Sequence, residues 1–340
     1  MDIQILFTQI NKAELLEVES QPMGADQVRV KTLFSTISNG TEKANITGDA
    51  TVSIYSKDTD PVVFPRASGY STSGIVVEKG ENVKNLEIGD KVAMYWTLHR
   101  SYNVVDEKNA VKIPDNVTLP EASIAHIATF PLAAIRKTRL EVGESAMIMG
   151  LGTLGLLAVG LARAAGAVPV IAVDPVKERR EKALQFGADY AFDPFDPDFI
   201  EKVKSVTNGG VNVAIEVTGQ GAGLNEALDC MAKFGRISLL GCTRNSDFTV
   251  DYYRKVHGPG ITIIGAHTLA RPNYDSYPGF FTTADDMKTV LKLCAMGRLD
   301  LKSLIEETHS PFECDEVYTR LVKDKNFPTV VQFDWSEVHK

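Results

Sequence analysis

Strict alternation of short apolar runs and helical stretches from residue 145 is the feature that most limits the fold. The apolar runs are "SAMIMG", "VPVIAV", "YAFD", "NVAIEVT", "RISLLG" and "ITIIGAH". Between them lie helical stretches such as "PVKERREKALQFG", "DPDFIEKVKSVTNGG" and "GLNEALDCMAKFG", several of which end in a glycine suited to a helix C-cap. Strands joined by helical crossovers run parallel, so we predict an α/β fold with a doubly wound parallel sheet.

The first apolar run leads directly into a glycine-rich turn, "GLGTLG", with glycines at positions 150, 152 and 155. The first glycine permits a tight turn, the second lets the backbone approach a pyrophosphate, and the third allows close packing of helix on strand. An Ala/Leu-rich helix follows the turn, and its N-terminus favours negative charge. The pattern therefore predicts a dinucleotide-binding site.

An acidic residue suited to the ribose of such a cofactor is also present. Asp174 ends the second apolar run, where a carboxylate accepts hydrogen bonds from ribose hydroxyls and repels a 2′-phosphate. We therefore expect NAD(H) rather than NADP(H), although Lys177 and Arg179 stand nearby. Turns after later strands belong to the same edge of the sheet. The cofactor-binding residues expected from these turns are Gly150, Gly152, Thr153, Leu154, Gly155, Asp174, Val217, Thr218, Gly241 and Cys242.

Residues 1–120 have a different character. Short β-rich runs alternate there with Gly, Pro and Asn breaks, which predicts a small barrel or sandwich. A helical stretch over 119–140 leads into the alternating region, and two helical segments with a last strand, "TVVQF", come after residue 275. The expected organisation is a β-rich domain over 1–120, a nucleotide-binding domain over 121–272, and a C-terminal return over 273–340 that completes the first domain.

Composition excludes several other classes of function. The formal net charge is −8 and Lys and Arg form no run or stripe, so the electrostatic footprint of a nucleic-acid-binding protein is missing. No apolar run reaches the ~18–20 residues that span a bilayer, and "MDIQILFTQINKAELLEVES" has none of the features of a secretion signal. The four cysteines form no C-x-x-C pair, which suits a reducing compartment. We expect a cytoplasmic protein whose partner is a small-molecule substrate.

The domain pattern, together with two further segments, resembles the medium-chain dehydrogenase/reductase superfamily. "GENVKNLEIGDKVAMYW" is similar to the family's G-x-x-V-x-x-x-x-x-G-D-x-V signature, and "PFECDEVYTRL" is similar to a later family segment. The resemblance implies a GroES-like catalytic domain, a Rossmann domain, and a homodimer or homotetramer formed through the edge strand "ITIIGAH". It also places Ala266 and His267 beside the nicotinamide, and Arg271 and Tyr274 where a polar or anionic substrate is read.

Most alcohol-oxidising members of that superfamily hold a catalytic zinc, and this chain departs from the ligand pattern at three places. Ser38, in "ISNGTE", stands near the first Cys position, Gly69-Tyr70-Ser71 replaces "GHE", and "AHIATFPLAAIRK" offers only His126. Ser and Tyr are poor zinc ligands. A site from Glu42, His99 and His126 is the alternative, which their spacing does not favour, so we expect no metal. The replacements resemble a subgroup that includes relatives of bacteriochlorophyllide dehydrogenase.

Without a metal, hydride exchange with an alcohol needs a protein group that takes up or donates the hydroxyl proton. Tyr70 is the first candidate, with packing in the vacated metal space as its alternative. Ser38 and Glu42 lie on the facing motif, where Glu42 acts as a base if desolvated and otherwise pairs structurally. His99, in "MYWTLHRSY", titrates in the useful range, although a structural role is the more common one for a single histidine. These four are the expected catalytic residues.

The leading interpretation is an NAD(H)-dependent, zinc-free oxidoreductase that transfers a hydride between nicotinamide and a secondary alcohol or its ketone, with a polyol, sugar or similar polar substrate. A zinc-free quinone or enone reductase is the second possibility. Asp174 and the Gly150-Leu151-Gly152 turn stand against it, because that branch usually prefers NADPH and has an Ala-rich turn. The third is a non-catalytic NAD(H)-binding sensor that has lost its metal and its activity.

Overall fold

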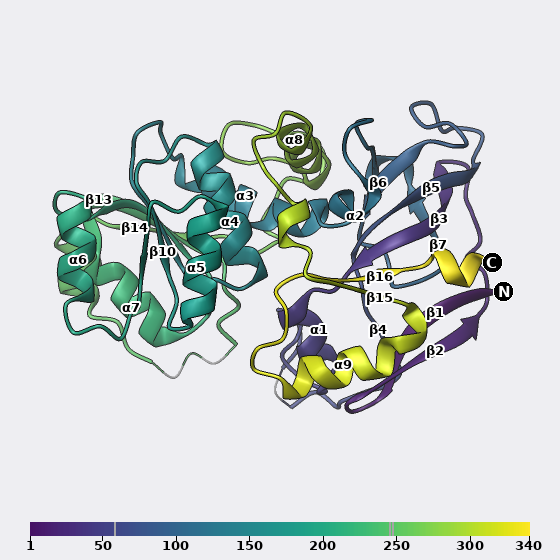
Figure 1. The fold of residues 1–340 in the computed structure, drawn as a ribbon, viewed down its shortest axis with the longest axis horizontal. Helices are drawn as coiled ribbons and strands as arrows, with labels where there is room; N and C mark the ends of the chain where they lie inside the picture. Colours follow the sequence, from purple (N-terminus) through teal and green to yellow (C-terminus); the bar gives the residue numbers. More distant parts are fainter. Residues whose placement is uncertain (58, 245, 247) are drawn as a thin grey trace. The chain divides into compact units, whose positions relative to one another are not determined.

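The chain divides into two compact units, which a computed structural model describes over residues 1–57, 59–244, 246 and 248–340 (Figure 1). The first unit comprises Met1–Ile127, Met287–Gly297 and Leu301–Lys340, and the second comprises Ala128–Asp286 and Arg298–Asp300. Two of these boundaries fall within the helices α3 (Ala125–Thr138) and α8 (Thr283–Ala295). The sequence predicts these boundaries after residues 120 and 272.

The second unit contains a six-stranded parallel sheet with the order β11-β10-β9-β12-β13-β14. Its strands are β9 (Ala146–Met149), β10 (Val170–Val173), β11 (Tyr190–Phe192), β12 (Val211–Glu216), β13 (Met231–Leu239) and β14 (Thr262–Gly265). The crossover helices are α4 (Thr153–Ala164), α5 (Lys177–Phe186), α6 (Phe199–Val206) and α7 (Gly221–Asp229). The predicted doubly wound sheet is confirmed, and its strand order reverses between β9 and β12.

Two helices differ from the sequence expectation. The helical pattern over 223–235 ends at Asp229, because Met231 already pairs with Val211 as the start of β13. The stretch 119–140 forms two helices, α2 (Leu119–Ala122) and α3, and the Ser123 hydroxyl donates a hydrogen bond to a carbonyl of α2 at the break between them. In the first case strand pairing overrides local helix propensity.

The first unit is built on two mostly antiparallel sheets, as its β-rich sequence predicts. The larger has the order β15-β16-β3-β5-β6-β8, with β7 also paired to β3, and the smaller has the order β2-β1-β4. The strands are β1 (Asp2–Gln9), β2 (Lys12–Val18), β3 (Gln27–Thr36), β4 (Arg66–Ala67), β5 (Ser71–Lys79), β6 (Lys91–Tyr95), β7 (Tyr102–Asp106), β8 (Ala110–Lys112), β15 (Glu307–His309) and β16 (Val331–Asp334). The helices α1 (Asn39–Ile46) and α9 (Cys314–Lys323) lie outside these sheets.

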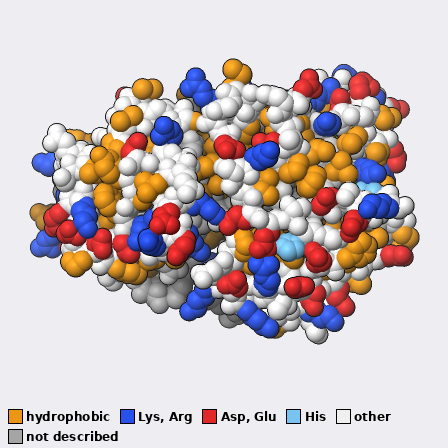
Figure 2. Space-filling model, viewed as in Figure 1, with side chains coloured by type: hydrophobic (Ala, Val, Ile, Leu, Met, Phe, Trp, Pro, Cys, Tyr) orange, Lys and Arg blue, Asp and Glu red, His pale blue; other side chains and the backbone are white. Residues whose placement is uncertain are grey.

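Each unit has its own hydrophobic core. In the first unit Phe7, Tyr318 and Trp335 pack in one buried cluster, so that the first strand and the last residues of the chain share a core. In the second unit Met147 and Ile171 belong to a cluster beneath the parallel sheet. Within the residues described, no helix is long and apolar enough to cross a membrane. Basic and acidic side chains are interspersed on the face seen in Figure 2.

Candidate active site and cofactor cradle

The residues expected to hold a cofactor lie at one edge of the parallel sheet. Each stands in a turn just after a strand: Gly150 after β9, Asp174 after β10, Val217 and Thr218 after β12, Gly241 and Cys242 after β13, and Ala266 and His267 after β14. Because every strand runs in the same direction, these turns meet at the carboxyl edge of the sheet. That edge, where the strand order reverses, is the usual ligand site of such folds.

Two glycines of the glycine-rich turn differ in the space around them: Gly155 leaves no room for a side chain, and Gly152 does. A Cβ on Gly155 would lie 1.9 Å from the carbonyl oxygen of Gly150, so helix and strand pack too closely for any side chain there. A Cβ on Gly152, the N-cap of α4, would meet nothing within 4 Å. Thr153 and Leu154 form the first turn of that helix. The backbone is therefore open to a ligand where the helix N-terminus favours a phosphate.

Asp174 ties the glycine turn to the end of β10. The carboxylate is buried, its Oδ2 accepts a hydrogen bond from the Leu151 amide at 2.8 Å, and its Oδ1 accepts one from the Val176 amide at 2.8 Å. Arg179 Nη1 stands 3.7 Å from Oδ2. Each carboxylate oxygen has two lone-pair sites, so both can accept a further hydrogen bond from a ribose hydroxyl.

A second buried carboxylate, Glu216, shapes the turn after β12 and was not among the expected site residues. It accepts hydrogen bonds from the amide of Thr218 at 2.7 Å and from the amide of Gly219 at 3.2 Å. Burial raises the pKa of Glu216, and the hydrogen bonds from Thr218 and Gly219 oppose that rise. Glu216 therefore positions Val217 and Thr218 at the cofactor edge.

In the first unit the structure brings the four expected catalytic residues together. The hydroxyl of Tyr70 donates a hydrogen bond to Oγ of Ser38, and both side chains are half-buried. Ser38 is the N-cap of α1, yet its hydroxyl makes no capping hydrogen bond. A serine at this position usually caps the helix, so this hydroxyl is free for the pair with Tyr70.

The carboxylate of Glu42 holds Ser38 in position through a hydrogen bond from its backbone amide. Its Oε1 accepts the Ser38 amide at 2.8 Å, and its Oε2 accepts hydrogen bonds from the Tyr318 hydroxyl and from His99 Nε2, the latter at 3.1 Å. Glu42, His99 and Tyr318 are all fully buried. Burial, and then the Glu42 carboxylate, raises the pKa of Tyr318, which keeps its phenol protonated as a donor.

The Glu42 carboxylate can only accept, so His99 carries a proton on Nε2, which faces it. On the other side of the ring, Ser35 Oγ lies 2.8 Å from His99 Nδ1 and accepts a hydrogen bond from Trp335 Nε1 at 2.8 Å. A Cβ on Gly69, whose φ is +94°, would lie 2.5 Å from the His99 amide nitrogen, so only glycine fits beside this ring. His99 is thus enclosed, and its contact with the candidate pair runs through Glu42.

His126, at the third position where the resemblance expects a ligand, packs against Tyr70. Its Nδ1 lies 2.7 Å from the Tyr70 carbonyl oxygen, and its ring centroid is 5.4 Å from the Tyr70 ring. The rings of Tyr95 and Trp96 lie 5.5 and 4.9 Å from the His126 ring. Trp96 keeps 47% of its surface exposed, so this aromatic cluster reaches the surface of the first unit beside the hydroxyl pair.

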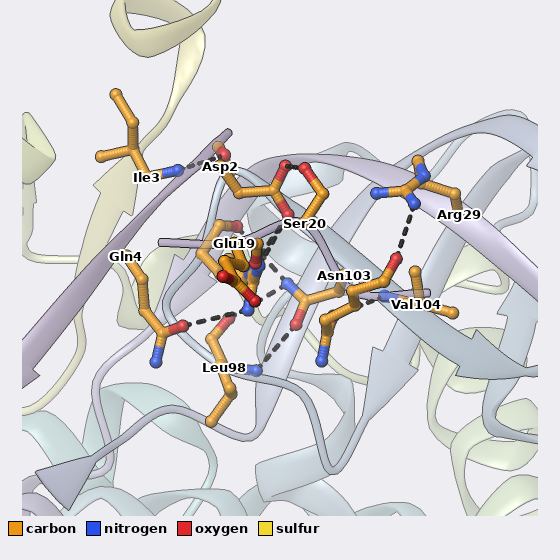
Figure 3. A network of polar contacts seen from close by, with 12 residues as sticks. Asp2, Ile3, Gln4, Glu19, Ser20, Arg29, Leu98, Asn103 and Val104 are labelled. Carbon is orange, nitrogen blue, oxygen red and sulfur yellow. Dashed lines mark hydrogen bonds and ion pairs between the residues drawn. The ribbon is translucent and has the colours of Figure 1, made fainter. Parts of the chain in front are cut away.

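A polar network anchors the segment that carries Trp96 and His99 (Figure 3). Asn103 accepts a hydrogen bond from the Leu98 amide at 2.9 Å and donates to the Leu98 carbonyl at 3.1 Å, which closes the loop on itself. The buried Arg100 pairs with Asp2 at 2.9 Å. The segment that carries His99 is therefore fixed to the first strand of the chain.

The donor atoms at the three positions where the resemblance expects ligands do not fit zinc. Two of them are the hydroxyls of Ser38 and Tyr70, which bond each other, and the third residue, His126, directs Nδ1 at a backbone carbonyl. Zinc prefers Cys, His and carboxylate ligands. Throughout residues 1–57, 59–244, 246 and 248–340, no group of three or more His, Cys, Asp or Glu side chains is placed to hold a metal ion.

The two residues expected to contact the substrate, Arg271 and Tyr274, differ in their surroundings: Arg271 is ion-paired within the second unit and Tyr274 is exposed. Arg271 pairs with Asp286 at 2.7 Å and donates to the carbonyl of Thr129, so its charge is directed into the second unit. Tyr274 is 86% exposed. Three supporting residues were not predicted from the sequence: Tyr318, Trp335 and Glu216. In the sequence they look like ordinary core or turn residues, because their polar partners are brought close only by the fold.

Known dehydrogenases are similar to this chain over most of its length. Residues 153–284 match a family model described as zinc-binding dehydrogenase. The chain is 28% identical over 337 residues to an L-threonine 3-dehydrogenase of Pyrococcus horikoshii, which covers 88% of this chain and 89% of that protein. It is 27% identical over 329 residues to a D-guloside 3-dehydrogenase of Escherichia coli K12, which covers 91% of this chain and 93% of that protein.

Among solved structures, an alcohol dehydrogenase from Escherichia coli CFT073 in complex with NADH shares the fold. Its TM-score is 0.81 at 20% identity, over 98% of this chain and 99% of that one. These similarities show that the chain has the fold of known dehydrogenases and that residues 153–284 resemble a zinc-binding dehydrogenase family. The match to a zinc-binding family contrasts with the donor atoms actually present at Ser38 and Tyr70.

Proposed function

Because this chain is an alcohol dehydrogenase-like oxidoreductase, we propose that it transfers a hydride between NAD(H) and a secondary alcohol or its ketone without catalytic zinc. The observation that carries the proposal is the hydrogen bond between Tyr70 and Ser38. Two hydroxyls occupy positions where the resemblance expects metal ligands, and they form the kind of pair that moves protons. Relatives named for threonine and for a guloside favour a polar secondary alcohol as substrate.

The hydroxyl pair accounts for the proton. In oxidation, the substrate O–H proton passes to Tyr70 Oη while the Tyr70 proton moves to Ser38 Oγ, and Ser38 releases its own proton to water. When bound, NAD⁺ would supply the hydride acceptor for the carbinol carbon. Gly152 and Asp174 of the second unit hold the pyrophosphate and the adenosine ribose of that cofactor in the proposal. Glu42 keeps Ser38 in position for the transfer.

Turnover across a substrate panel tests the proposal. NAD⁺ reduction is measured with secondary alcohols, polyols and sugars, in the presence and absence of a strong chelator, for the wild type, Tyr70→Phe and Ser38→Ala. Tyr95→Phe is the matched control, because Tyr95 lies in the same aromatic cluster but its hydroxyl donates to the carbonyl of Lys108 at 3.0 Å. Loss of a positioned acid–base group costs roughly 10²–10⁴-fold in rate.

The expected result is chelator-resistant turnover that falls steeply in Tyr70→Phe and Ser38→Ala and stays near wild type in Tyr95→Phe. Chelator-sensitive turnover would overturn the zinc-free mechanism and direct attention to Glu42, His99 and His126. Tight NADH binding without turnover on any alcohol would contradict the dehydrogenase proposal. An enone panel would then separate an enone reductase from an NAD(H)-binding sensor.

We also propose that two copies associate through β14, the last strand in the order of the parallel sheet. Ile263 and Ile264 of this strand are partly exposed, and a strand edge with free backbone groups readily pairs with another strand. Light scattering of the purified protein should give the mass of a dimer or tetramer. A monomer at micromolar concentration would contradict this assembly.

A further inference from the structure

An ammonium group lies buried at the end of β14 in the second unit. Lys137, in the last turn of α3, is 7% exposed, and its Nζ donates a hydrogen bond to the carbonyl of Gly265 at 3.2 Å. Among the described residues, Lys137 forms no ion pair within 4.0 Å. An ammonium has three donors, and the bond to Gly265 uses one of them.

The carboxylate whose charge acts on Lys137, that of Asp286, already forms ion pairs with two arginines. Asp286, which is fully buried, pairs with Arg271 at 2.7 Å and with Arg136 at 3.2 Å. Burial lowers the pKa of Lys137, the neighbouring Arg271 lowers it further, and Asp286 opposes both effects. A buried cation without an anionic partner is costly to the fold, so its presence points to an anion that comes from outside the chain.

His267 provides a second donor beside it. The Leu269 amide donates a hydrogen bond to His267 Nδ1 at 3.2 Å, which leaves the ring proton on Nε2. Burial, and then the charge of Lys137, lowers the pKa of His267 and keeps the ring neutral. A Cβ on Gly265, between the two residues, would meet nothing within 4 Å. The backbone at Gly265 is therefore open, and the charge of Lys137 reaches His267 at the same end of β14.

We propose that Lys137 and His267 form a subsite for an anionic group of the substrate, a carboxylate or a phosphate. The inference rests on the proposed function, because a substrate that exchanges a hydride with nicotinamide must lie at this end of the cofactor edge. Such a group carries two or more acceptor oxygens, which match an ammonium and an imidazole N–H. In this proposal Lys137 binds the anionic group that the resemblance assigns to Arg271, because Arg271 is paired with Asp286.

Binding of simple anions to the cofactor complex tests the subsite. NADH affinity is first measured by fluorescence titration, and inorganic phosphate and acetate are then titrated calorimetrically into the protein–NADH complex. The variants are Lys137→Met and His267→Ala. Lys233→Met is the control, because it removes the same charge from an exposed position on β13 of the same unit.

The wild type is expected to bind at least one of the two anions, and the preferred anion identifies a phosphate or a carboxylate substrate. Lys137→Met should weaken that binding by about tenfold or more, as the loss of a charge-assisted hydrogen bond does. Lys233→Met should leave it unchanged. If thermal unfolding shows that Lys137→Met does not fold, His267→Ala decides the question with the same expected direction, because His267 is only half-buried.

Equal anion affinity in the wild type and both variants would overturn the subsite. So would a protein–NADH complex that binds neither anion, and in both cases the proposed dehydrogenase function would stand. Failure to bind NADH at all would instead contradict the proposed function. With turnover in hand, KM for hydroxy acids or polyol phosphates should rise in Lys137→Met, while KM for neutral polyols stays the same.

Discussion

Oε1 of Glu42 accepts a hydrogen bond from the backbone amide of Ser38 at 2.8 Å. The other oxygen of the same carboxylate accepts hydrogen bonds from His99 and Tyr318, which are 57 and 276 residues from Glu42 in sequence. Three donors from separate segments thus bond to one buried carboxylate, and one of them is the backbone amide of Ser38 in the hydroxyl pair. A change at Glu42 is therefore expected to affect both stability and catalysis.

Glu42→Gln should destabilise the first unit and slow turnover. In glutamine an NH2 donor replaces one acceptor oxygen, so a donor faces either the donors of His99 and Tyr318 or the Ser38 amide. Leaving a buried donor unsatisfied costs about 1–3 kcal/mol. Urea unfolding should show a loss of that size, whereas Glu17→Gln, at an exposed position on β2, should change stability by less than about 0.5 kcal/mol. Equal stability of both variants would contradict the role of Glu42.

Gly152→Ala and Gly155→Ala should fail in different ways. A methyl group at position 152 meets nothing within 4 Å, so the variant should fold normally and lose NADH affinity, because the methyl occupies the space left for the pyrophosphate. A methyl group at position 155 would lie 1.9 Å from the Gly150 carbonyl oxygen and should lower the thermal midpoint. Thermal melts and NADH titrations of both variants separate the two effects. Normal NADH affinity in Gly152→Ala would place the pyrophosphate elsewhere.

Asp174→Ala should reverse or abolish the preference for NADH over NADPH. The variant loses the proposed ribose acceptor, while the positive charge of Arg179, 3.7 Å from Asp174 in the wild type, remains for a 2′-phosphate. NADH affinity should fall about tenfold, and NADPH affinity should hold or rise. Asp198→Ala, at an exposed position before α6, serves as the control in the same fluorescence titrations. Unchanged selectivity in Asp174→Ala would show that the ribose is read elsewhere.

The cysteines should differ in reactivity. Burial raises the pKa of Cys230 and of Cys314 to about 12, so neither thiol ionises near neutral pH. Cys242 is exposed in the turn after β13, and a thiol reagent should modify it first in the native protein. Saturating NADH should slow that modification, because Cys242 belongs to the expected cofactor edge. Peptide mapping of the labelled protein checks both outcomes, and labelling of Cys242 that NADH does not slow would remove it from that edge.

Glu307 should contribute to acid stability. Its carboxylate accepts hydrogen bonds from Arg320 at 2.9 and 3.0 Å, which lowers its pKa from 4.5 to about 2, with burial opposing and His309 assisting. A carboxyl whose folded pKa lies below its unfolded value stabilises the fold above the unfolded pKa and loses that contribution as the pH falls toward the folded pKa. Glu307→Gln should therefore melt below the wild type at neutral pH, and the difference should close between pH 4.5 and pH 2. Glu81→Gln, at an exposed position, should show no such convergence.

The cofactor edge was largely predictable because its signals are local. The turn with Gly150 and Gly152 and the acidic end of the second strand each follow an apolar run, and the parallel order of the strands then places them at one edge. Strand β13 was expected to begin near Arg236, because Met231 lies in a helical pattern that only its pairing with Val211 overrides. The hairpin of β1 and β2 was not predicted, since no glycine marks its turn and Asn11 adopts the positive φ there.

The resemblance names candidate residues for the active site but does not predict the hydrogen bonds between them. Ser38 and Tyr70 were identified by resemblance, and their hydrogen bond depends on the fold. Tyr318 and Trp335 are far from Glu42 and His99 in sequence, and aromatic residues in apolar surroundings give no sign of a polar partner. Lys137 looks like an ordinary basic residue in the last turn of a helix, a common position for lysine. Only the position of β14 shows what its ammonium group contacts.

The shared core of the first and last segments has a consequence for synthesis. Residues 128–286 leave the ribosome as a nearly complete unit before Tyr318 and Trp335 have been made, and domains fold as units as they emerge. Glu42 and His99 are translated early, whereas Tyr318, the donor to Glu42, follows the whole second unit in sequence. The second unit can therefore fold before the polar centre around Glu42 receives its Tyr318 donor.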